Sequence, residues 1–314
     1  METIFIKHPI RASKYRRPQV FALGYFDGVH KGHQQVIGQA KKEAVSSNVP
    51  LSVMTFHPHP IEVLRPSQSP LKVLTPLKDK IKYLEELGVD YLYVVEFSLP
   101  FSKLSPEEFV HNYLYSLDAT HVVAGFDFTY GAMGMGNMGT LVNHSNGQFG
   151  VTTVEKYSKN NEKVSSTLIR KLLTEGNVEQ ASELLSRTFS IKGIVSGGEK
   201  RGRQIGFPTA NVAAEPYIIP KVGVYAVEFV VNNQTFKGVC NIGYKPTFHD
   251  KRDVASIEVH ILNFDQQIYG EEVEVYFLKR MRDEKKFNSV DELIQQITKD
   301  KQTAIEFFNG LKNQ

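Results

Sequence analysis

The stretch that most constrains the fold runs from Ala22 to His33 and reads ALGYFDGVHKGH. Apolar residues lead up to Gly24 as in a buried strand, a glycine-rich turn follows, and the periodicity after it predicts a helix over Gln34 to Ser46. A strand, a glycine turn and a helix in this order place backbone N–H groups and the positive end of a helix against phosphates. The stretch therefore predicts a phosphate site at the end of a strand.

The turn ends in His30-Lys-Gly-His33, the His-x-Gly-His pattern that is typical of nucleotidylyltransferases. Imidazoles in such a turn can donate hydrogen bonds to phosphate oxygens as negative charge develops at an α-phosphate. We therefore take His30 and His33 as candidate catalytic residues, and Gly24, Asp27 and Gly32 as candidates for binding ATP phosphates. The alternative is a pair of core or solvent-facing histidines after an ordinary turn.

Strands and helices alternate over the first half of the chain. Val20 is taken as the start of the first strand, and Pro76 and Pro106 are expected to open helices. The expected strands cover residues 20–23, 51–56, 91–95, 121–124 and 151–155. This alternation predicts an α/β fold with a doubly wound parallel sheet, which binds ligands at the carboxyl ends of its strands. Because of its His-x-Gly-His pattern, we expect this domain to resemble nucleotidyltransferases.

The segment Thr55-Phe-His-Pro-His-Pro60 follows the second expected strand, and its two prolines are expected to prevent continuation of a strand or helix. His57 and His59 could serve as metal ligands, but two histidines in a proline turn are more often structural. We expect His57 instead to shape a ligand pocket, because it follows a strand end.

Two more segments carry candidate binding residues. Gly125-Phe-Asp-Phe-Thr-Tyr-Gly131 opens a glycine- and methionine-rich stretch, residues 126–139, that is expected to be a loop. Its Asp127 and Phe128 either bind a base and phosphate or belong to a loop packed by its own aromatic rings. Ser165-Ser-Thr-Leu-Ile-Arg170 starts a helix with hydroxyl residues, which suits a triphosphate, although alone it would be an ordinary helix cap. The candidate phosphate ligands of this last segment are Ser166, Thr167 and Arg170.

The sequence pattern changes near residue 187. Short segments rich in β-branched residues follow, separated by turns with Gly, Asn and Pro, and an amphipathic helix is expected over Ser289 to Phe308. The expected strands cover residues 189–195, 223–231, 235–242, 255–262 and 272–278. This spacing predicts a mostly β barrel domain over residues 187–314, after an α/β domain over residues 1–186.

The second half has a candidate phosphate loop, Gly197-Gly-Glu-Lys-Arg-Gly-Arg203. Such a glycine-rich, basic loop could wrap phosphates with backbone N–H groups, although similar loops are often plain solvated turns. The candidate phosphate-binding residues of this loop are Gly198, Lys200 and Gly202.

Three further residues of the second half could carry chemistry. Thr209 and Asn211 lie in Gly206-Phe-Pro-Thr-Ala-Asn211 and offer oxygen ligands for Mg²⁺ and ATP phosphates. Glu258 lies within a β-branched strand. It is either a general base that faces a cavity or a side chain on the solvent face of the strand.

Composition sets further expectations. The net charge of +3 is too small to indicate nucleic-acid binding. The single cysteine, Cys240, excludes an internal disulfide and a cysteine-based zinc site, and it favours a reducing cytoplasm. We find neither a run of about 18 apolar residues nor the apolar segment of a signal peptide. We expect a cytoplasmic protein that acts on small molecules, without nucleic-acid or membrane partners, and whose oligomeric state is open.

With these motifs in view, the chain resembles the bifunctional prokaryotic riboflavin kinase/FAD synthetases along essentially its whole length. The first half is similar to the FMN adenylyltransferase module through the four segments described above. The second half is similar to the riboflavin kinase module. Its matching segments are Lys200-Arg-Gly-Arg203, Gly206-Phe-Pro-Thr-Ala-Asn211, Gly238-Val-Cys-Asn-Ile-Gly243, Lys245-Pro-Thr-Phe248, Ile257-Glu-Val-His260, Tyr269-Gly270 and Arg282-Asp-Glu-Lys-Lys-Phe287.

The resemblance implies two reactions. The second module would phosphorylate riboflavin with ATP to give FMN, with Glu258 taking the hydroxyl proton and Thr209 and Asn211 positioning Mg²⁺ and ATP. The first module would adenylylate FMN to FAD and release pyrophosphate, with His30 and His33 stabilising the transition state and Mg²⁺ sharing the charge. The flavin-binding residues implied by the resemblance are His57, Asp127, Phe128 and Arg282.

Two loops differ from the pattern that is common in the resembled family. Residues 132–137 contain no basic residue, and Gly197-Gly-Glu199 stands where His-Gly-Asp is common. Loss of phosphate-facing cations would weaken binding of ATP or FMN. Two alternatives therefore stay open: an enzyme with only one of the two activities, and a flavin-sensing regulator without turnover. The presence of His33 and Glu258 argues against the regulator, which would not need them.

Overall fold

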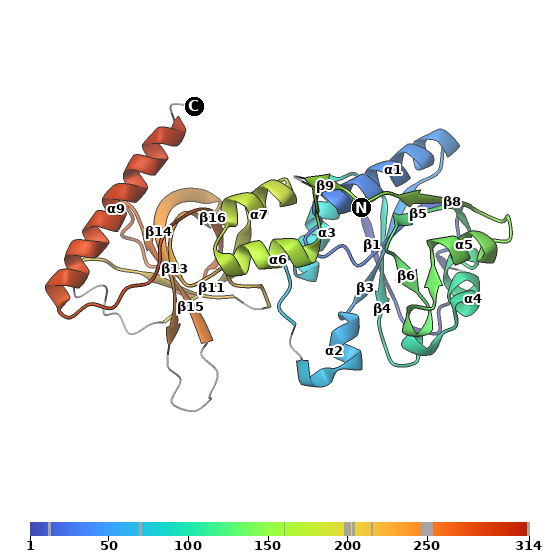
Figure 1. Cartoon of the computed structure of the whole chain (residues 1–314), viewed down its shortest axis with the longest axis horizontal. Coiled ribbons are helices and arrows are strands. Elements are labelled where there is room, and N and C mark those ends of the chain that lie inside the picture. The colour runs from blue at the N-terminus through green and yellow to red at the C-terminus, as the bar shows by residue number, and fades with distance from the viewer. Residues whose placement is uncertain are drawn as a thin grey trace. The chain divides into compact units, whose positions relative to one another are not determined.

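The computed structural model describes residues 1–11, 14–68, 71–159, 161–197, 202, 205–214, 216–245 and 254–312. The chain divides into two compact units, Met1–Ser166 and Thr167–Gln314, and Figure 1 labels many of their helices and strands. Each unit has a sheet and a hydrophobic core of its own.

The first unit is built on a six-stranded sheet with the order β1-β4-β3-β2-β5-β8. All neighbouring strands are parallel. The strands are β1 (Glu2–Ile6), β2 (Gln19–Leu23), β3 (Leu51–His57), β4 (Tyr91–Glu96), β5 (Ala119–Gly125) and β8 (Gly150–Val154). Every residue of β2 is buried, as expected for a central strand covered on both faces. The predicted parallel sheet is confirmed.

Helices cover both faces of this sheet. The longer helical segments are α1 (Lys31–Ser47), α2 (Pro60–Leu64), α3 (Leu77–Glu86), α4 (Pro106–Phe109), a π-helical segment (Val110–Tyr115) and α5 (Met138–His144). Ile37 of α1 and Leu84 of α3 share a core with Val53 of β3. The neighbouring residue Met54 shares another core with Leu141 of α5. Because successive residues of a strand point to opposite faces, the fold is doubly wound as predicted.

Helix α1 begins at Lys31, so the prediction that it starts at Gln34 is wrong by one turn. The cause is His30, which is the N-cap residue: its Nδ1 accepts a hydrogen bond from the backbone N–H of His33 at 3.3 Å. Such a bond satisfies one of the amides that a helix start leaves without a partner. Both histidines of the motif therefore belong to the helix start rather than to the turn before it.

Three elements of the first unit differ from the sequence prediction. Strand β1 precedes Val20, which was expected to open the first strand. Pro60 begins α2, because His59 and Glu62 form a capping box and proline fits the first helical position. Residues 126–139 are not a plain loop, because they contain a short hairpin and the start of α5. The short strands of this unit are β6 (Thr129–Tyr130), β7 (Gly136–Asn137), β9 (Ser158–Lys159) and β10 (Glu162–Lys163).

The second unit is a closed barrel with the strand order β11-β12-β15-β14-β13-β16. Its strands are β11 (Ser190–Ser196), β12 (Ala210–Ala213), β13 (Gly223–Val231), β14 (Gln234–Lys245), β15 (Val254–Ile261) and β16 (Glu272–Arg282). Its helices include α6 (Ser166–Glu175), α7 (Val178–Leu185) and α9 (Val290–Lys312), and Phe308 of α9 is buried in a core with Ala226 of β13. The predicted barrel and terminal helix are confirmed. The four residues of β12 were not predicted, because so short a strand gives no clear alternation.

Candidate functional site

The carboxyl end of β2 leads directly into the histidine pair. The rings of His30 and His33 are stacked, with centroids 3.6 Å apart and planes inclined by 16°. Phe26 meets the His33 ring edge-on at 5.3 Å. Gly32 provides the room for this arrangement, since a Cβ there would lie 3.3 Å from the His30 ring. Gly24 does the same for Phe26, whose ring a Cβ would approach to 2.9 Å.

His33 is held in the neutral form. Burial lowers its pKa well below 6.5, and the charges of His30, Lys80 and Lys163 lower it further. Its Nδ1 is enclosed and has no hydrogen-bond partner in the described structure. A neutral imidazole keeps one N–H donor and one acceptor. His33 can therefore offer a hydrogen bond at the N-terminus of α1, where the helix dipole also favours an anion.

Asp27 anchors the turn. Its buried carboxylate accepts hydrogen bonds from the backbone N–H groups of Leu74 (3.1 and 3.2 Å) and Thr75 (3.0 Å). Thr75 also contacts the turn through its hydroxyl, which accepts a hydrogen bond from the backbone N–H of Gly28. The structure thus gives Asp27 a role in fixing the turn, and direct phosphate binding by this residue stays a prediction.

Ser166 joins the same turn. Its hydroxyl donates a hydrogen bond of 2.8 Å to the backbone carbonyl of Asp27. This hydrogen bond joins Ser166, the first residue of α6, to the glycine turn, although 139 residues separate Ser166 from Asp27 in the sequence. Thr167 and Arg170 continue α6 in the second unit, and their part in phosphate binding stays a prediction.

The end of β3 lies beside the turn. The hydroxyl of Thr55 donates to the backbone carbonyl of Tyr25 at 3.0 Å, and the ring of His59 meets the Tyr25 ring edge-on at 4.4 Å. His57 is exposed at the strand end, and its pKa is lowered by partial burial and by the charge of Lys80. His57 and the histidine pair thus lie at the carboxyl ends of the neighbouring strands β3 and β2.

Two lysines of this region were missed by the sequence reasoning. Lys80 is buried on α3, and its ammonium donates to the Tyr25 carbonyl at 2.6 Å. Lys163, in β10, forms an ion pair with Asp127 and lies 4.6 Å from the centre of the Phe126 ring. A lysine within an amphipathic helix resembles a solvated one, so the sequence carries no signal for Lys80. The two lysines supply positive charge near His33 that the loop over residues 132–137 lacks.

Asp127 and Phe128 follow β5 as predicted. Asp127 is exposed and paired with Lys163, whereas Phe128 is half-buried and stacks on Tyr130 at 6.1 Å. Tyr130 is held in turn by His144, whose Nδ1 lies 2.8 Å from the phenol oxygen. The self-packed alternative therefore describes Phe128 well, while Asp127 remains open to solvent.

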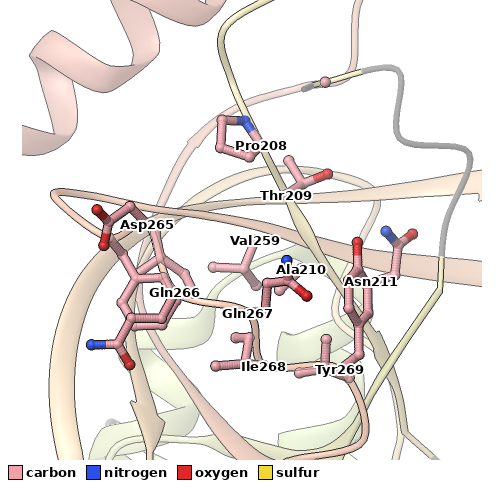
Figure 2. A pocket seen from close by; sticks show the side chains of 14 residues that line it. Pro208, Thr209, Ala210, Asn211, Val259, Asp265, Gln266, Gln267, Ile268 and Tyr269 are labelled. Atoms are coloured by element: carbon pink, nitrogen blue, oxygen red, sulfur yellow. The ribbon is translucent and has the colours of Figure 1, made fainter. Parts of the chain in front are cut away.

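The second unit contains a cavity of about 260 Å³. Thr209 and Asn211 line it together with Gly202, as shown in Figure 2 for the first two. The segment from Asp265 to Tyr269 forms its other wall. The lining residues are Val195, Gly202, Pro208, Thr209, Ala210, Asn211, Val259, Ile261, Phe264, Asp265, Gln266, Gln267, Ile268 and Tyr269. The structure thus brings three predicted phosphate or metal ligands to one cavity.

Glu258 lies directly beside Asn211. The two residues are paired across β12 and β15, and Asn241 of β14 is paired with Glu258 on its other side. Residues paired in this way project from the same face of a sheet, so the three side chains form a polar row. Glu258 is half-buried. Glu258 is not among the residues that line the cavity, whereas its neighbour Val259 is, and successive residues of a strand project to opposite faces. The role of Glu258 as a general base therefore stays a prediction.

None of the other predicted binding residues of the second unit, Gly198, Lys200 and Arg282, is among the described residues that line the cavity. Gly198 and Lys200 lie outside the described residues. The guanidinium of Arg282 makes a two-pronged ion pair with the buried carboxylate of Asp300 on α9, with N–O distances of 2.9 and 2.6 Å. Its Nη1 also donates to the backbone carbonyl of Asp283 at 2.8 Å. Arg282 thus fastens α9 to the barrel, and its predicted contact with a flavin remains a prediction.

The donor set suits magnesium rather than a softer metal. Within the described part of the chain, no group of three or more His, Cys, Asp or Glu residues could hold a metal ion. The cavity is instead lined by Thr209 and Asn211, whose side chains carry a hydroxyl and an amide oxygen. Mg²⁺ binds through a few oxygen ligands and completes its shell with water and substrate phosphates, so these two side chains fit it.

Within the ranges that the structure describes, no helix combines the length and the apolar character needed to span a membrane. Cys240 is buried in the barrel, and burial raises the pKa of its thiol.

Two known family models match the chain, one in each half. Residues 12–168 match the family model described as FAD synthetase, and residues 185–308 match the one described as riboflavin kinase. The chain is 50% identical over 315 residues to the bifunctional riboflavin kinase/FMN adenylyltransferase of Bacillus subtilis strain 168, with 99% of this chain and 100% of that protein covered. The protein of the same name from Listeria monocytogenes is 49% identical over 315 residues, with 100% of both covered.

A solved structure has the same fold. The crystal structure described as a macrolide-efflux protein from Streptococcus pneumoniae matches with a TM-score of 0.88 and 36% identity, covering 97% of this chain and 99% of that one. The order of the two family models and the full-length identity to the bacterial relatives lead to one conclusion. The chain belongs to the family of bifunctional riboflavin kinase/FMN adenylyltransferases.

Proposed function

We propose that this protein converts riboflavin to FMN and then FMN to FAD, using one ATP in each step. The names of the relatives and the two family models support both activities. The observation that carries the proposal furthest is the stacked pair of His30 and His33 at the N-terminus of α1. This arrangement suits a reaction in which charge builds up on a phosphate.

In the adenylylation step, a phosphate oxygen of FMN attacks the α-phosphorus of ATP. The bond from that phosphorus to the bridging oxygen of the β-phosphate breaks, and pyrophosphate leaves with the bonding electrons. His30 and His33 donate hydrogen bonds to the oxygens on which charge develops. Ser166, Thr167 and Arg170 hold the departing phosphates, while Gly24, Asp27 and Gly32 maintain the turn. His57, Asp127 and Phe128 contact the flavin.

In the phosphorylation step, the 5′-hydroxyl of the ribityl chain attacks the γ-phosphorus of ATP and ADP leaves. Glu258 accepts the hydroxyl proton, and Asn211 beside it helps to position the phosphates. The loop with Gly198, Lys200 and Gly202 covers the phosphates, and Arg282 contacts the flavin. Most of the rate enhancement comes from positioning and from neutralising charge.

Magnesium belongs to the proposal as well. Thr209 and Asn211 would hold it at the cavity of the second unit. When bound there, the ion would neutralise charge on the ATP phosphates. A second Mg²⁺ would accompany the ATP used for adenylylation.

We further assign residues 1–186 to the adenylyltransferase domain and residues 187–314 to the kinase domain. The family models support this division, since one ends at residue 168 and the other begins at residue 185. The compact units divide earlier, between Ser166 and Thr167. In the second unit the backbone N–H of Lys221 bonds to the carbonyl of Leu173 on α6 at 2.9 Å. The reduced, buried thiol of Cys240 suits the cytoplasm, where we place the protein.

A single incubation tests this proposal. Purified protein is mixed with riboflavin, Mg²⁺ and ATP, and the products are separated by chromatography. FMN should appear first and FAD should follow it. FMN without FAD, or FAD from added FMN but no product from riboflavin, would instead identify an enzyme with one activity. Tight flavin binding without either product would identify a flavin-sensing regulator.

A further inference from the structure

Lys80 is a buried cation next to the histidine pair. It lies on α3 and is 3% exposed. Its ammonium donates to the backbone carbonyl of Tyr25 at 2.6 Å and lies 3.5 Å from the hydroxyl of Thr55. It also lies 4.1 Å from the centre of the Tyr25 ring. All of these groups are neutral, so they solvate the charge without cancelling it.

No carboxylate of the described residues forms an ion pair with Lys80. The acid that acts on it electrostatically is Asp27, whose charge opposes the effect of burial on the pKa of Lys80. The carboxylate of Asp27 is itself engaged by the backbone N–H groups of Leu74 and Thr75. A buried ammonium without a paired carboxylate is costly to the fold. Such a group calls for a reason beyond packing.

A structural role of Lys80 in holding the turn at Tyr25 does not explain why a charged side chain is buried there. The Tyr25 carbonyl already accepts a hydrogen bond from the neutral hydroxyl of Thr55 at 3.0 Å. A neutral side chain at position 80 would leave that carbonyl with a partner. What Lys80 adds, and Thr55 does not, is a full positive charge.

The charge of Lys80 acts on two histidines of the proposed adenylylation site. The charge of Lys80 lowers the pKa of His33 on α1 and of His57 at the end of β3. Helix α1 begins at Lys31, and the N-terminus of a helix favours anions. The buried charge, the helix end and the imidazoles thus combine around one place that suits a phosphate group.

We infer that Lys80 is a positioning residue of the adenylyltransferase site, whose buried charge attracts the phosphates of ATP and FMN and stabilises the charge that develops as pyrophosphate leaves. The inference rests on the proposed function. It adds a residue that acts electrostatically, from its contact with Tyr25 in the turn that precedes α1.

The ionisation of Lys80 provides a readout that a structural role would not give. Burial lowers its pKa to about 8, against the opposing charge of Asp27. The other ionisable groups around it are Tyr25, His33 and His57, and the two histidines are neutral near that pH. The kcat/KM for ATP in FAD formation should therefore fall as the pH rises through about 8.

Stability provides a second readout. Because the folded pKa of Lys80 is lower than the value of 10.5 for the unfolded chain, its ammonium opposes folding at neutral pH, and this cost falls as the pH rises from about 8 to 10.5. Methionine has nearly the same length and no charge. Lys80→Met should therefore retain or raise the thermal midpoint while it loses activity. A residue needed only for structure would lose both together.

The experiment compares the full-length wild type, Lys80→Met and Lys82→Met. Lys82 lies on the same helix, is exposed and pairs with Glu86, so its variant is the matched control. FAD formation from FMN and ATP is measured across pH, with FMN formation from riboflavin as an internal control. Pyrophosphate binding is measured by calorimetry, because it reports the anion site without turnover.

We expect Lys80→Met to lower kcat/KM for ATP in FAD formation by at least about tenfold, and to weaken pyrophosphate binding. The fall near pH 8 should be lost, and FMN formation and the thermal midpoint should be kept. Lys82→Met should match the wild type. The inference is overturned if Lys80→Met keeps its FAD activity within about twofold, if its loss follows a lower midpoint, or if the wild type shows no fall near pH 8. A wild type that binds pyrophosphate through Lys80 but makes no FAD would refute the proposed adenylylation and support the inferred charge effect.

Discussion

The imidazole rings of His30 and His33 stack with their centroids 3.6 Å apart, at the first turn of α1. The Nδ1 of His30 is engaged with the backbone N–H of His33, so the first histidine also caps the helix that carries the second. The two histidines of the motif therefore have different structural roles at the start of α1. One residue fixes the helix start, and the other is presented there as a neutral donor.

Replacement of the second histidine tests that assignment. His33→Ala should lower FAD formation from FMN by at least about 100-fold, because it removes a preorganised donor to the developing charge. FMN formation from riboflavin should stay close to the wild-type rate. His111→Ala, at an exposed histidine of the same unit, is the control. A His33→Ala protein that is folded and still makes FAD at the wild-type rate would remove His33 from the mechanism.

The neutral state of His33 has a consequence for stability. Its folded pKa lies well below 6.5, the value expected for the unfolded chain. The unfolded chain therefore takes up a proton first as the pH falls, so this stability contribution is present above pH 6.5 and is lost below it. The thermal midpoint should drop less between about pH 7.5 and 5.5 in His33→Gln than in the wild type. His57 and His260, whose pKa values are also lowered, contribute equally to both proteins. Equal drops would contradict the burial argument.

The parts of the fold that could be predicted are those with long, regular patterns. The alternation up to residue 125 gave the parallel sheet, and β13 (Gly223–Val231) matches its prediction residue for residue. The start of α1 was misplaced because a histidine cap is uncommon and Gly32 is typical of a turn. Lys80 could not be found, because burial of a lysine depends on what packs over α3.

The carboxylate of Asp27 should matter more for stability than that of Asp127. Asp27→Ala would leave the buried N–H groups of Leu74 and Thr75 without their acceptor, at a cost on the order of 2 kcal/mol in the free energy of unfolding. Asp127→Ala removes only an exposed ion pair with Lys163, which contributes at most about 1 kcal/mol. Urea denaturation measures both. If Asp127→Ala were the more damaging change, the anchoring role of Asp27 would be wrong.

The pairing of Arg282 with Asp300 predicts a loss that a second change can repair. Arg282→Met leaves the buried Asp300 carboxylate without its cation and should lower the unfolding free energy by on the order of 2–3 kcal/mol, since Arg282 is itself partly exposed. Asp300→Leu in the same chain should restore most of this loss. The measurement is again urea denaturation, together with the KM for riboflavin. A raised KM with unchanged stability would show instead that Arg282 acts mainly on the flavin.

The polar row of Asn211, Glu258 and Asn241 predicts the opposite phenotype to His33→Ala. Glu258→Gln keeps the shape of the side chain but cannot accept the hydroxyl proton, so FMN formation should fall by at least about 100-fold. FAD formation from supplied FMN should be unaffected. Asp265→Asn, on the other wall of the cavity, serves as a comparison. Loss of both activities in folded Glu258→Gln would contradict two separate sites.

The product profile from riboflavin tests the central claim most directly. Wild-type protein with riboflavin, Mg²⁺ and excess ATP should first accumulate FMN, then convert it to FAD with release of one pyrophosphate per FAD. In parallel, His33→Ala should stop at FMN, and Glu258→Gln should make FAD only when FMN is added. A wild type that stops at FMN, or that leaves riboflavin unchanged, would contradict the account of one chain with two successive activities.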